Sequence, residues 1–144
     1  MCSHFTSNMR LKNFSLQFGW QIFKALGDES RVRIINLLLT HKEMCVTDLE
    51  LILDFTQTKT SRHMIYLKNA GLVRQKKEEA WTFYYIKEEV LDIVEQIFTY
   101  LKKDVTLTQD LETYKTLFSN RELVAYKITT KKYTNTDPRL RVYK

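Results

Sequence analysis

Residues 57–62 concentrate side chains that can hydrogen-bond to the edges of nucleobases. A glutamine pairs with adenine, an arginine with guanine, and a serine or threonine with either base. The lysine in the same stretch carries a compact ammonium group, which suits a phosphate oxygen better than a base. If this stretch begins a helix, its free backbone amides also attract phosphate. We therefore expect a DNA-binding surface that includes Gln57, Thr58, Lys59, Ser61 and Arg62.

Positive charge gathers in two parts of the chain. The 144 residues have a formal net charge of +6, and residues 57–77 contain six lysines and arginines without a single acid. Residues 121–144 contain seven basic residues and two acids, so the remainder of the chain is nearly neutral. Such basic blocks are either ordinary solvated surface or a surface that binds a polyanion. Double-stranded DNA is the obvious candidate for that polyanion. The further side chains expected to contact DNA are Arg74, Lys76 and Lys77.

Helices must position most of these side chains. The chain has only three glycines and one proline, and its apolar residues recur at helical spacing. This spacing predicts helices over residues 10–26, 29–39, 48–53, 57–70, 88–102 and 108–118. Residues 72–77 and 81–86 are instead rich in β-branched and aromatic types, which predicts a hairpin with its tip at residues 78–80. The expected fold is mainly α with a small β-hairpin wing.

Local signals indicate how these elements begin and pack. Thr47 and Glu50 have the spacing of a capping box at the start of the third helix. Thr56 can cap the fourth helix, in which Ile65 and Leu67 are expected to face the core. Alternate aromatic residues of the second strand are expected to anchor the wing on the core, namely Trp81, Phe83 and Tyr85.

Two short helices joined by a tight turn and followed by a basic hairpin have the layout of a winged helix-turn-helix. The sequence resembles the ArsR/SmtB family of bacterial repressors in residues 23–34, 61–63, 67–73 and 84–85. The family usually has Gly where this chain has Asp54 and Pro where it has Glu29. Aspartate tolerates a left-handed turn, so we expect the fold to be kept.

The resemblance covers residues 15–100 and implies how the protein would act. It implies a homodimer built by the first and fifth helices, binding to a partly palindromic operator, and release when a small effector binds. We expect a winged helix-turn-helix domain over residues 1–103 and a C-terminal extension over residues 104–144. The helix of the extension is expected to lengthen the dimer interface. Its basic tail either contacts phosphates or lacks order.

Residues 43–49 resemble the segment in which relatives of this type bind arsenite or metals. There, two cysteines flank a valine, but here the second position is Thr47. One thiol cannot hold a thiophilic ion, which needs two to four thiolates or imidazoles. A zinc or arsenite site would therefore require several residues together, and the candidates are Cys2, His4, His41 and Cys45. The alternative, which we favour, is that Cys45 is a small buried hydrophobe and that no metal is bound.

Other classes of function find less support. The family's second metal site needs a histidine on the fifth helix, which has only Asp92 and Glu95, and we expect His63 to serve packing or hydrogen bonding. No phosphate-binding loop or cluster of histidines with carboxylates suggests an enzyme. No apolar run approaches the roughly 20 residues of a membrane span, and two cysteines favour the cytoplasm. The competing hypothesis is a winged-helix module for protein–protein assembly, which would need an apolar patch in place of the basic one.

Overall fold

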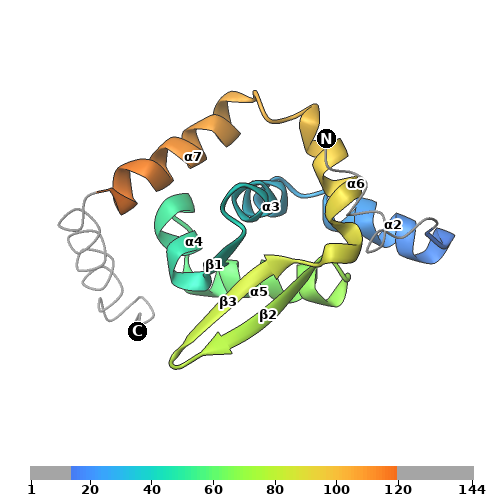
Figure 1. Cartoon of the computed structure of the whole chain (residues 1–144), viewed down its shortest axis with the longest axis horizontal. Coiled ribbons are helices and arrows are strands. Elements are labelled where there is room, and N and C mark those ends of the chain that lie inside the picture. Colours follow the sequence, from blue (N-terminus) through green and yellow to red (C-terminus); the bar gives the residue numbers. More distant parts are fainter. Residues whose placement is uncertain (1–13, 120–144) are drawn as a thin grey trace.

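The computed structural model describes residues 14–119 and shows a mainly helical fold with one small antiparallel sheet (Figure 1). The predicted helices and hairpin are present, although the first four residues of the first predicted helix lie outside the described part. In chain order, the described elements are α2 (Leu16–Ala25), α3 (Glu29–His41), β1 (Glu43–Cys45), α4 (Val46–Leu53), α5 (Gln57–Asn69), β2 (Val73–Glu78), β3 (Trp81–Ile86), α6 (Glu88–Thr99) and α7 (Val105–Phe118).

Helices α4 and α5 form the predicted helix-turn-helix. Asp54 ends α4 in the left-handed conformation, with φ 58° and ψ 41°, which aspartate tolerates better than most residues. Thr56 then caps α5, because its hydroxyl oxygen accepts a hydrogen bond of 3.1 Å from the amide of Lys59. Gly71 follows α5 with φ 86°, and a Cβ at this position would lie 3.0 Å from the Phe18 ring. The turn chemistry is therefore as the sequence predicted.

The start of α4 differs from the prediction. The helix begins at Val46, and its N-cap is the extended residue Cys45, whose side chain makes no capping hydrogen bond. Thr47 therefore lies inside the first turn, and the predicted capping box with Glu50 is wrong. The physical reason is β1, a strand that the sequence pattern did not indicate. Its pairing with β3 runs directly into α4 and starts the helix earlier than the local signal indicated.

The sheet has the order β1-β3-β2, and its register decides which side of the wing meets the core. Of the residues in β3, Tyr84 and Ile86 are buried, whereas Trp81 at the far end is exposed. The prediction that Trp81, Phe83 and Tyr85 anchor the wing is therefore wrong by one residue. Successive side chains of a strand point to opposite faces, so an error of one residue exchanges the buried and exposed faces. Residues 83–85 are all aromatic, so the sequence gives both faces a similar character, and packing selects the buried one.

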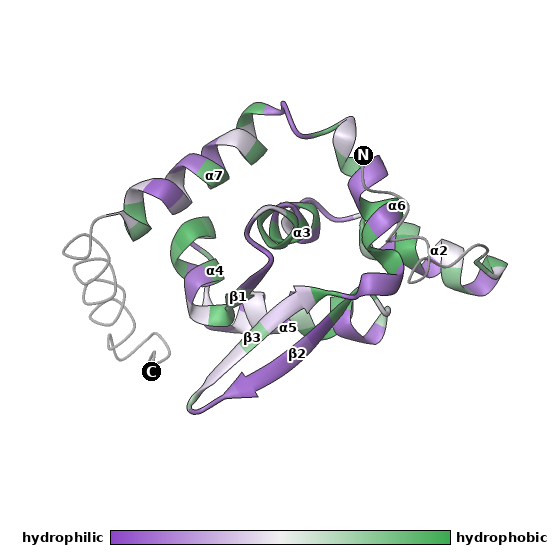
Figure 2. Ribbon diagram, in the orientation of Figure 1, coloured by the Kyte–Doolittle hydropathy of each residue, from purple (hydrophilic) through white to green (hydrophobic). Residues whose placement is uncertain are grey.

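Helix α3 lies at the centre of the molecule, and the other elements pack around it (Figure 1). Its middle turns are fully buried at Ile34, Ile35, Leu37 and Leu38. Figure 2 shows hydrophobic segments on α3 and α4, whereas β2 is hydrophilic along most of its length. Burial of the apolar side chains is the main stabilising contribution to such a core, so α3 is the scaffold that positions the helix-turn-helix and the wing.

Helix α7 packs on α3 and α4 of the same chain (Figure 1). The guanidinium of Arg33 donates two hydrogen bonds to the carboxylate of Asp110, at 2.9 and 2.8 Å. The ring of His41 stacks on Tyr114 with 3.6 Å between the ring centres, and Leu117 belongs to the core cluster. Helix α7 therefore shares the core of the preceding helices. The predicted basic tail lies outside the described residues.

Within residues 14–119, every helix is too short or too polar to span a lipid bilayer.

Candidate nucleic-acid interface

Helix α5 has one face in the core and one face at the surface. Its buried residues are Thr60, His63, Met64 and Leu67. Since an α-helix turns once every 3.6 residues, positions 58, 62, 65 and 69 lie on the opposite side. All four are exposed, and we call them the outward stripe of α5, which consists of Thr58, Arg62, Ile65 and Asn69.

Three of the five residues predicted from the segment 57–62 lie on this stripe or at its edge, and a fourth is exposed in the first turn of the same helix. Thr58 and Arg62 are members of it, Gln57 is exposed in the first turn, and Ser61 is half-buried at its edge. The structure thus gathers one amide, two hydroxyls and one guanidinium on adjoining positions near the start of one helix. These groups can donate to and accept from base edges.

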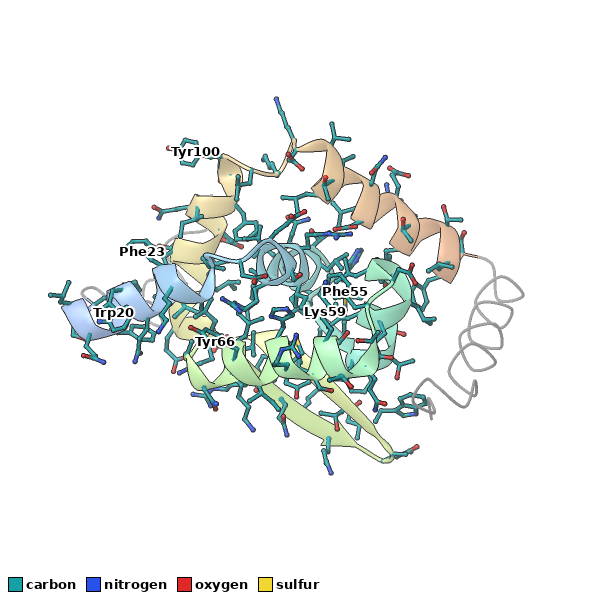
Figure 3. All side chains as sticks on the ribbon, turned by 180° about the vertical axis from the view of Figure 1, so that it is seen from behind. Trp20, Phe23, Phe55, Lys59, Tyr66 and Tyr100 are labelled. Carbon is teal, nitrogen blue, oxygen red and sulfur yellow. The ribbon has the colours of Figure 1, made fainter. Side chains whose placement is uncertain are left out.

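The fifth residue, Lys59, points to another side of the helix. Its ammonium nitrogen lies 4.0 Å from the centre of the Phe55 ring, and Figure 3 shows the two residues next to each other. This is the geometry of a cation–π interaction. Lys59 therefore covers the turn of the helix-turn-helix and stands at the flank of the stripe, where a phosphate is a better partner than a base.

Two members of the outward stripe were not predicted as site residues. Ile65 was expected to face the core, but its side chain is 55% exposed, so this prediction is wrong. The residue directly before it, Met64, occupies the core position instead. The other member is Asn69, at the end of the helix. The helical spacing from Thr58 and Arg62 was the signal in the sequence that could have identified both.

Arg31 of α3 holds α5 in its orientation. Its guanidinium carbon lies 4.0 Å from the centre of the Tyr66 ring, and its Nη1 lies 3.3 Å from Nδ1 of His63. Arginine has no acceptor, so Nδ1 of His63 must accept this hydrogen bond. Burial lowers the pKa of His63, and the charge of Arg31 acts in the same direction, whereas the carboxylate of Asp28 opposes the shift. The predicted hydrogen-bonding role of His63 is confirmed.

The hairpin of β2 and β3 projects along the same lower side of the molecule as α5 in Figure 1. Its register divides the basic residues between two faces. Lys77 pairs with Thr82, two positions from the buried Tyr84, so Lys77 shares the face that packs on the helices. Arg74 and Lys76 lie on the other face, where they pair with Tyr85 and Phe83.

Ion pairs occupy the basic residues of that other face. The ammonium of Lys76 lies 2.9 Å from the carboxylate of Glu43 and 3.5 Å from that of Glu78. The hydrogen bond to Glu43 raises the pKa of Lys76. Arg74 lies 3.4 Å from Glu89. Lys77 is exposed and has no acidic partner in the described part of the chain, so its charge is the least neutralised of the three.

The candidate metal ligands are in unfavourable surroundings. Cys45 is buried, and burial raises the pKa of its thiol to about 11, although metals bind the thiolate. Burial also lowers the pKa of His41, whose ring is stacked on Tyr114. Cys2 and His4 lie outside the described residues. Between residues 14 and 119, no three histidine, cysteine or acidic side chains gather closely enough to hold a metal ion.

Comparison with known proteins places these features in context. Residues 28–75, from α3 into β2, match the family described as bacterial regulatory protein, arsR family. An uncharacterized HTH-type transcriptional regulator of Methanocaldococcus jannaschii is 38% identical over 81 residues, which cover 54% of this chain and 91% of the relative. The arsenical resistance operon repressor of Escherichia coli is 40% identical over 70 residues, covering 49% of this chain and 60% of the repressor.

A solved structure supports the same likeness in three dimensions. HlyU from Vibrio cholerae N16961 superposes with a TM-score of 0.55 and 29% sequence identity, over 58% of this chain and 91% of HlyU. Residues 28–75, which contain the outward stripe of α5, therefore match a known family by sequence, and more than half of the chain has a fold similar to that of HlyU.

Proposed function

Because the chain belongs to the ArsR family of bacterial regulatory proteins, we propose that it binds a palindromic operator as a homodimer, with one α5 in each of two successive major grooves. The protein is a DNA-binding transcription repressor of the winged helix-turn-helix type. It acts by occupying DNA in the cytoplasm and catalyses no reaction. An effector that weakens the complex would relieve repression.

The outward stripe of α5 is the observation that carries the proposal for base recognition. Thr58 and Arg62 are exposed on the side of α5 away from the core, with Gln57 and Ser61 beside them. The recognition helix of a helix-turn-helix contacts base edges mainly through its N-terminal residues. Here the hydrogen-bonding side chains lie in the first six residues of α5, and the core behind them keeps the helix rigid.

The proposal of a homodimer rests on exposed apolar side chains of α2 and of the end of α6. Phe23 is 68% exposed and Tyr100 is 89% exposed. Figure 3 shows Trp20, Phe23 and Tyr100 along one side of the molecule. Exposed apolar groups gathered in this way commonly mark a protein–protein interface. A twofold pair would present two copies of α5 about one turn of DNA apart, roughly 34 Å.

Replacing Arg62 by alanine tests the placement of the base-reading surface. We expect the variant to lose discrimination at one base pair of each half-site by about tenfold or more, because alanine cannot make the bidentate hydrogen bonds to guanine. Binding to an operator selected from random duplex DNA, and to its single-base variants, would be measured by fluorescence anisotropy.

Lys68→Ala is the matched control for Arg62, because it removes a positive charge from an exposed position of the same helix outside the stripe. It should weaken all sequences alike. If Arg62→Ala keeps the sequence preference of the wild type, α5 does not read DNA with this face.

Lys77 and Lys76 provide a test of the wing. We expect Lys77→Ala to weaken binding to every sequence and to reduce the slope of log affinity against log salt by about one for each phosphate that the ammonium neutralised. Lys76→Ala should have a smaller effect, because Glu43 and Glu78 already hold its ammonium. Titrations at four salt concentrations measure both slopes. Equal slopes for the two variants would contradict this assignment of the two faces of the wing.

A further inference from the structure

Ile65 stands apart from the other residues of the outward stripe. It is a branched apolar side chain that is 55% exposed, and it lies three positions after Arg62 and seven after Thr58. It therefore shares their side of α5, one turn beyond the guanidinium. Exposure of this isoleucine to water is unfavourable in free energy, and contact with another apolar group would relieve it.

The fold itself does not supply that contact. Core contacts of α5 come from the opposite side, through Thr60, His63, Met64 and Leu67. The exposed apolar residues of the proposed dimer surface belong to α2 and the end of α6, and Figure 3 shows Trp20, Phe23 and Tyr100 at one edge of the molecule. Helix α5 extends away from that edge in the same view. Only the last turn of α5 meets that edge, where Tyr66 and Asn69 line a pocket together with Trp20. A partner that covers Ile65 would therefore approach the outward side of α5.

The major groove presents only one apolar group on its base edges, the C5-methyl group of thymine. We propose that Ile65 is a specificity-determining residue that packs against the methyl group of a thymine in each half-site. Ile65 lies about 4.5 Å along the helix from Arg62, and base pairs are about 3.4 Å apart. The thymine therefore lies within one or two base pairs of the base that Arg62 contacts. This inference rests on the proposed function, since it requires α5 to enter the groove.

Replacement of thymine by deoxyuridine tests the inference, because it removes the methyl group and leaves every hydrogen-bonding group in place. The full-length protein would first select an operator from random duplex DNA. Each thymine of that operator would then be replaced in turn, in both half-sites together. We expect one position at which the wild type loses about fourfold in affinity for each methyl group, on the order of fifteenfold for the two half-sites.

The variant Ile65→Ala completes a double-mutant cycle. It should bind the thymine operator more weakly by a similar factor and should be insensitive to deoxyuridine at that position, while it stays sensitive to base changes opposite Arg62. Val105→Ala is the matched control, because Val105 is also an exposed branched residue, 70% accessible on α7. It should keep the full sensitivity of the wild type to deoxyuridine.

Two outcomes would overturn the inference. One is a wild type that tolerates deoxyuridine at every position, and the other is an Ile65→Ala variant that remains as sensitive as the wild type. In both cases an operator selected in the first step, together with relaxed specificity in Arg62→Ala, would leave the proposed function standing. If no duplex sequence is selected at all, the proposed function fails and the inference fails with it.

Discussion

Replacing Phe23 by aspartate is expected to convert the protein from a dimer to a monomer and to weaken operator binding at least about 100-fold. Phe23 is 68% exposed in the single chain, and in the proposed dimer the new carboxylate would be buried against an apolar partner surface. An unpaired charge in such a place is strongly unfavourable. A monomer also loses the increase in affinity that comes from engaging two half-sites at once, which is typically 10²- to 10⁴-fold.

Sedimentation equilibrium measures the first effect, because the mass should fall to that of one chain, 17.3 kDa. Trp81→Asp is the control, since it places the same charge on an exposed aromatic residue of the wing, away from α2. It should remain dimeric. If Phe23→Asp keeps the mass of a dimer at micromolar concentration, the exposed face of α2 is not the interface. The helical circular dichroism of both variants should match the wild type.

Removing the carboxylate of Asp110 is expected to lower the free energy of unfolding by about 2–3 kcal/mol. Asp110 and Arg33 form a two-hydrogen-bond ion pair whose side chains are 6% and 22% exposed. With Asp110→Ala, the guanidinium of Arg33 would keep its charge in a largely buried position without its carboxylate partner. Helix α7 would also lose a main attachment to α3. Urea denaturation followed by circular dichroism measures the change.

Two further variants test whether the loss of stability comes from the broken Arg33–Asp110 ion pair and not merely from removing a charge from α7. Glu112→Ala breaks an exposed ion pair with Lys115 on the same helix, at 3.8 Å, and should change stability by less than about 0.5 kcal/mol. The double variant Arg33→Met with Asp110→Leu should recover most of the stability that Asp110→Ala removes, since it leaves no unpaired charge. If Glu112→Ala lowers the free energy of unfolding as much as Asp110→Ala does, any substitution in α7 is destabilising. The loss in Asp110→Ala could then not be assigned to the ion pair with Arg33.

The helices and the turn were predictable because their causes are local. Apolar residues at helical spacing, the cap at Thr56 and the left-handed tolerance of Asp54 each involve neighbours within about four residues. The exposure of most of the proposed DNA-contacting residues was predictable for the same reason, because an amide, hydroxyls and a guanidinium near the start of a helix are polar side chains that favour the surface. Local rules were sufficient wherever one signal acted without competition.

The errors occurred where two local interpretations differed by a single residue. Ile65 and Met64 are adjacent apolar residues, but only Met64 lies three positions from Leu67 and shares its side of the helix. Ile65 lies two positions from Leu67, about 200° around the helix from it, so helical spacing itself contradicted the prediction. In β3, the aromatic run 83–85 offers two faces of equal character. In this strand the packing of the rest of the chain made the choice. Strand β1 likewise moved the start of α4, although Thr47 and Glu50 had the spacing of a cap.

Hydrophobic periodicity and turn chemistry depend on near neighbours, so they were sufficient to predict a helix-turn-helix with a basic hairpin. Which charges stay unpaired and which apolar groups stay exposed depended on contacts between distant parts of the folded chain. The partners that settle those questions are distant in the chain, as Arg33 and Asp110 are, 77 positions apart. Lys76 meets Glu43 only because β1 and β2 flank β3, and no local pattern records that arrangement.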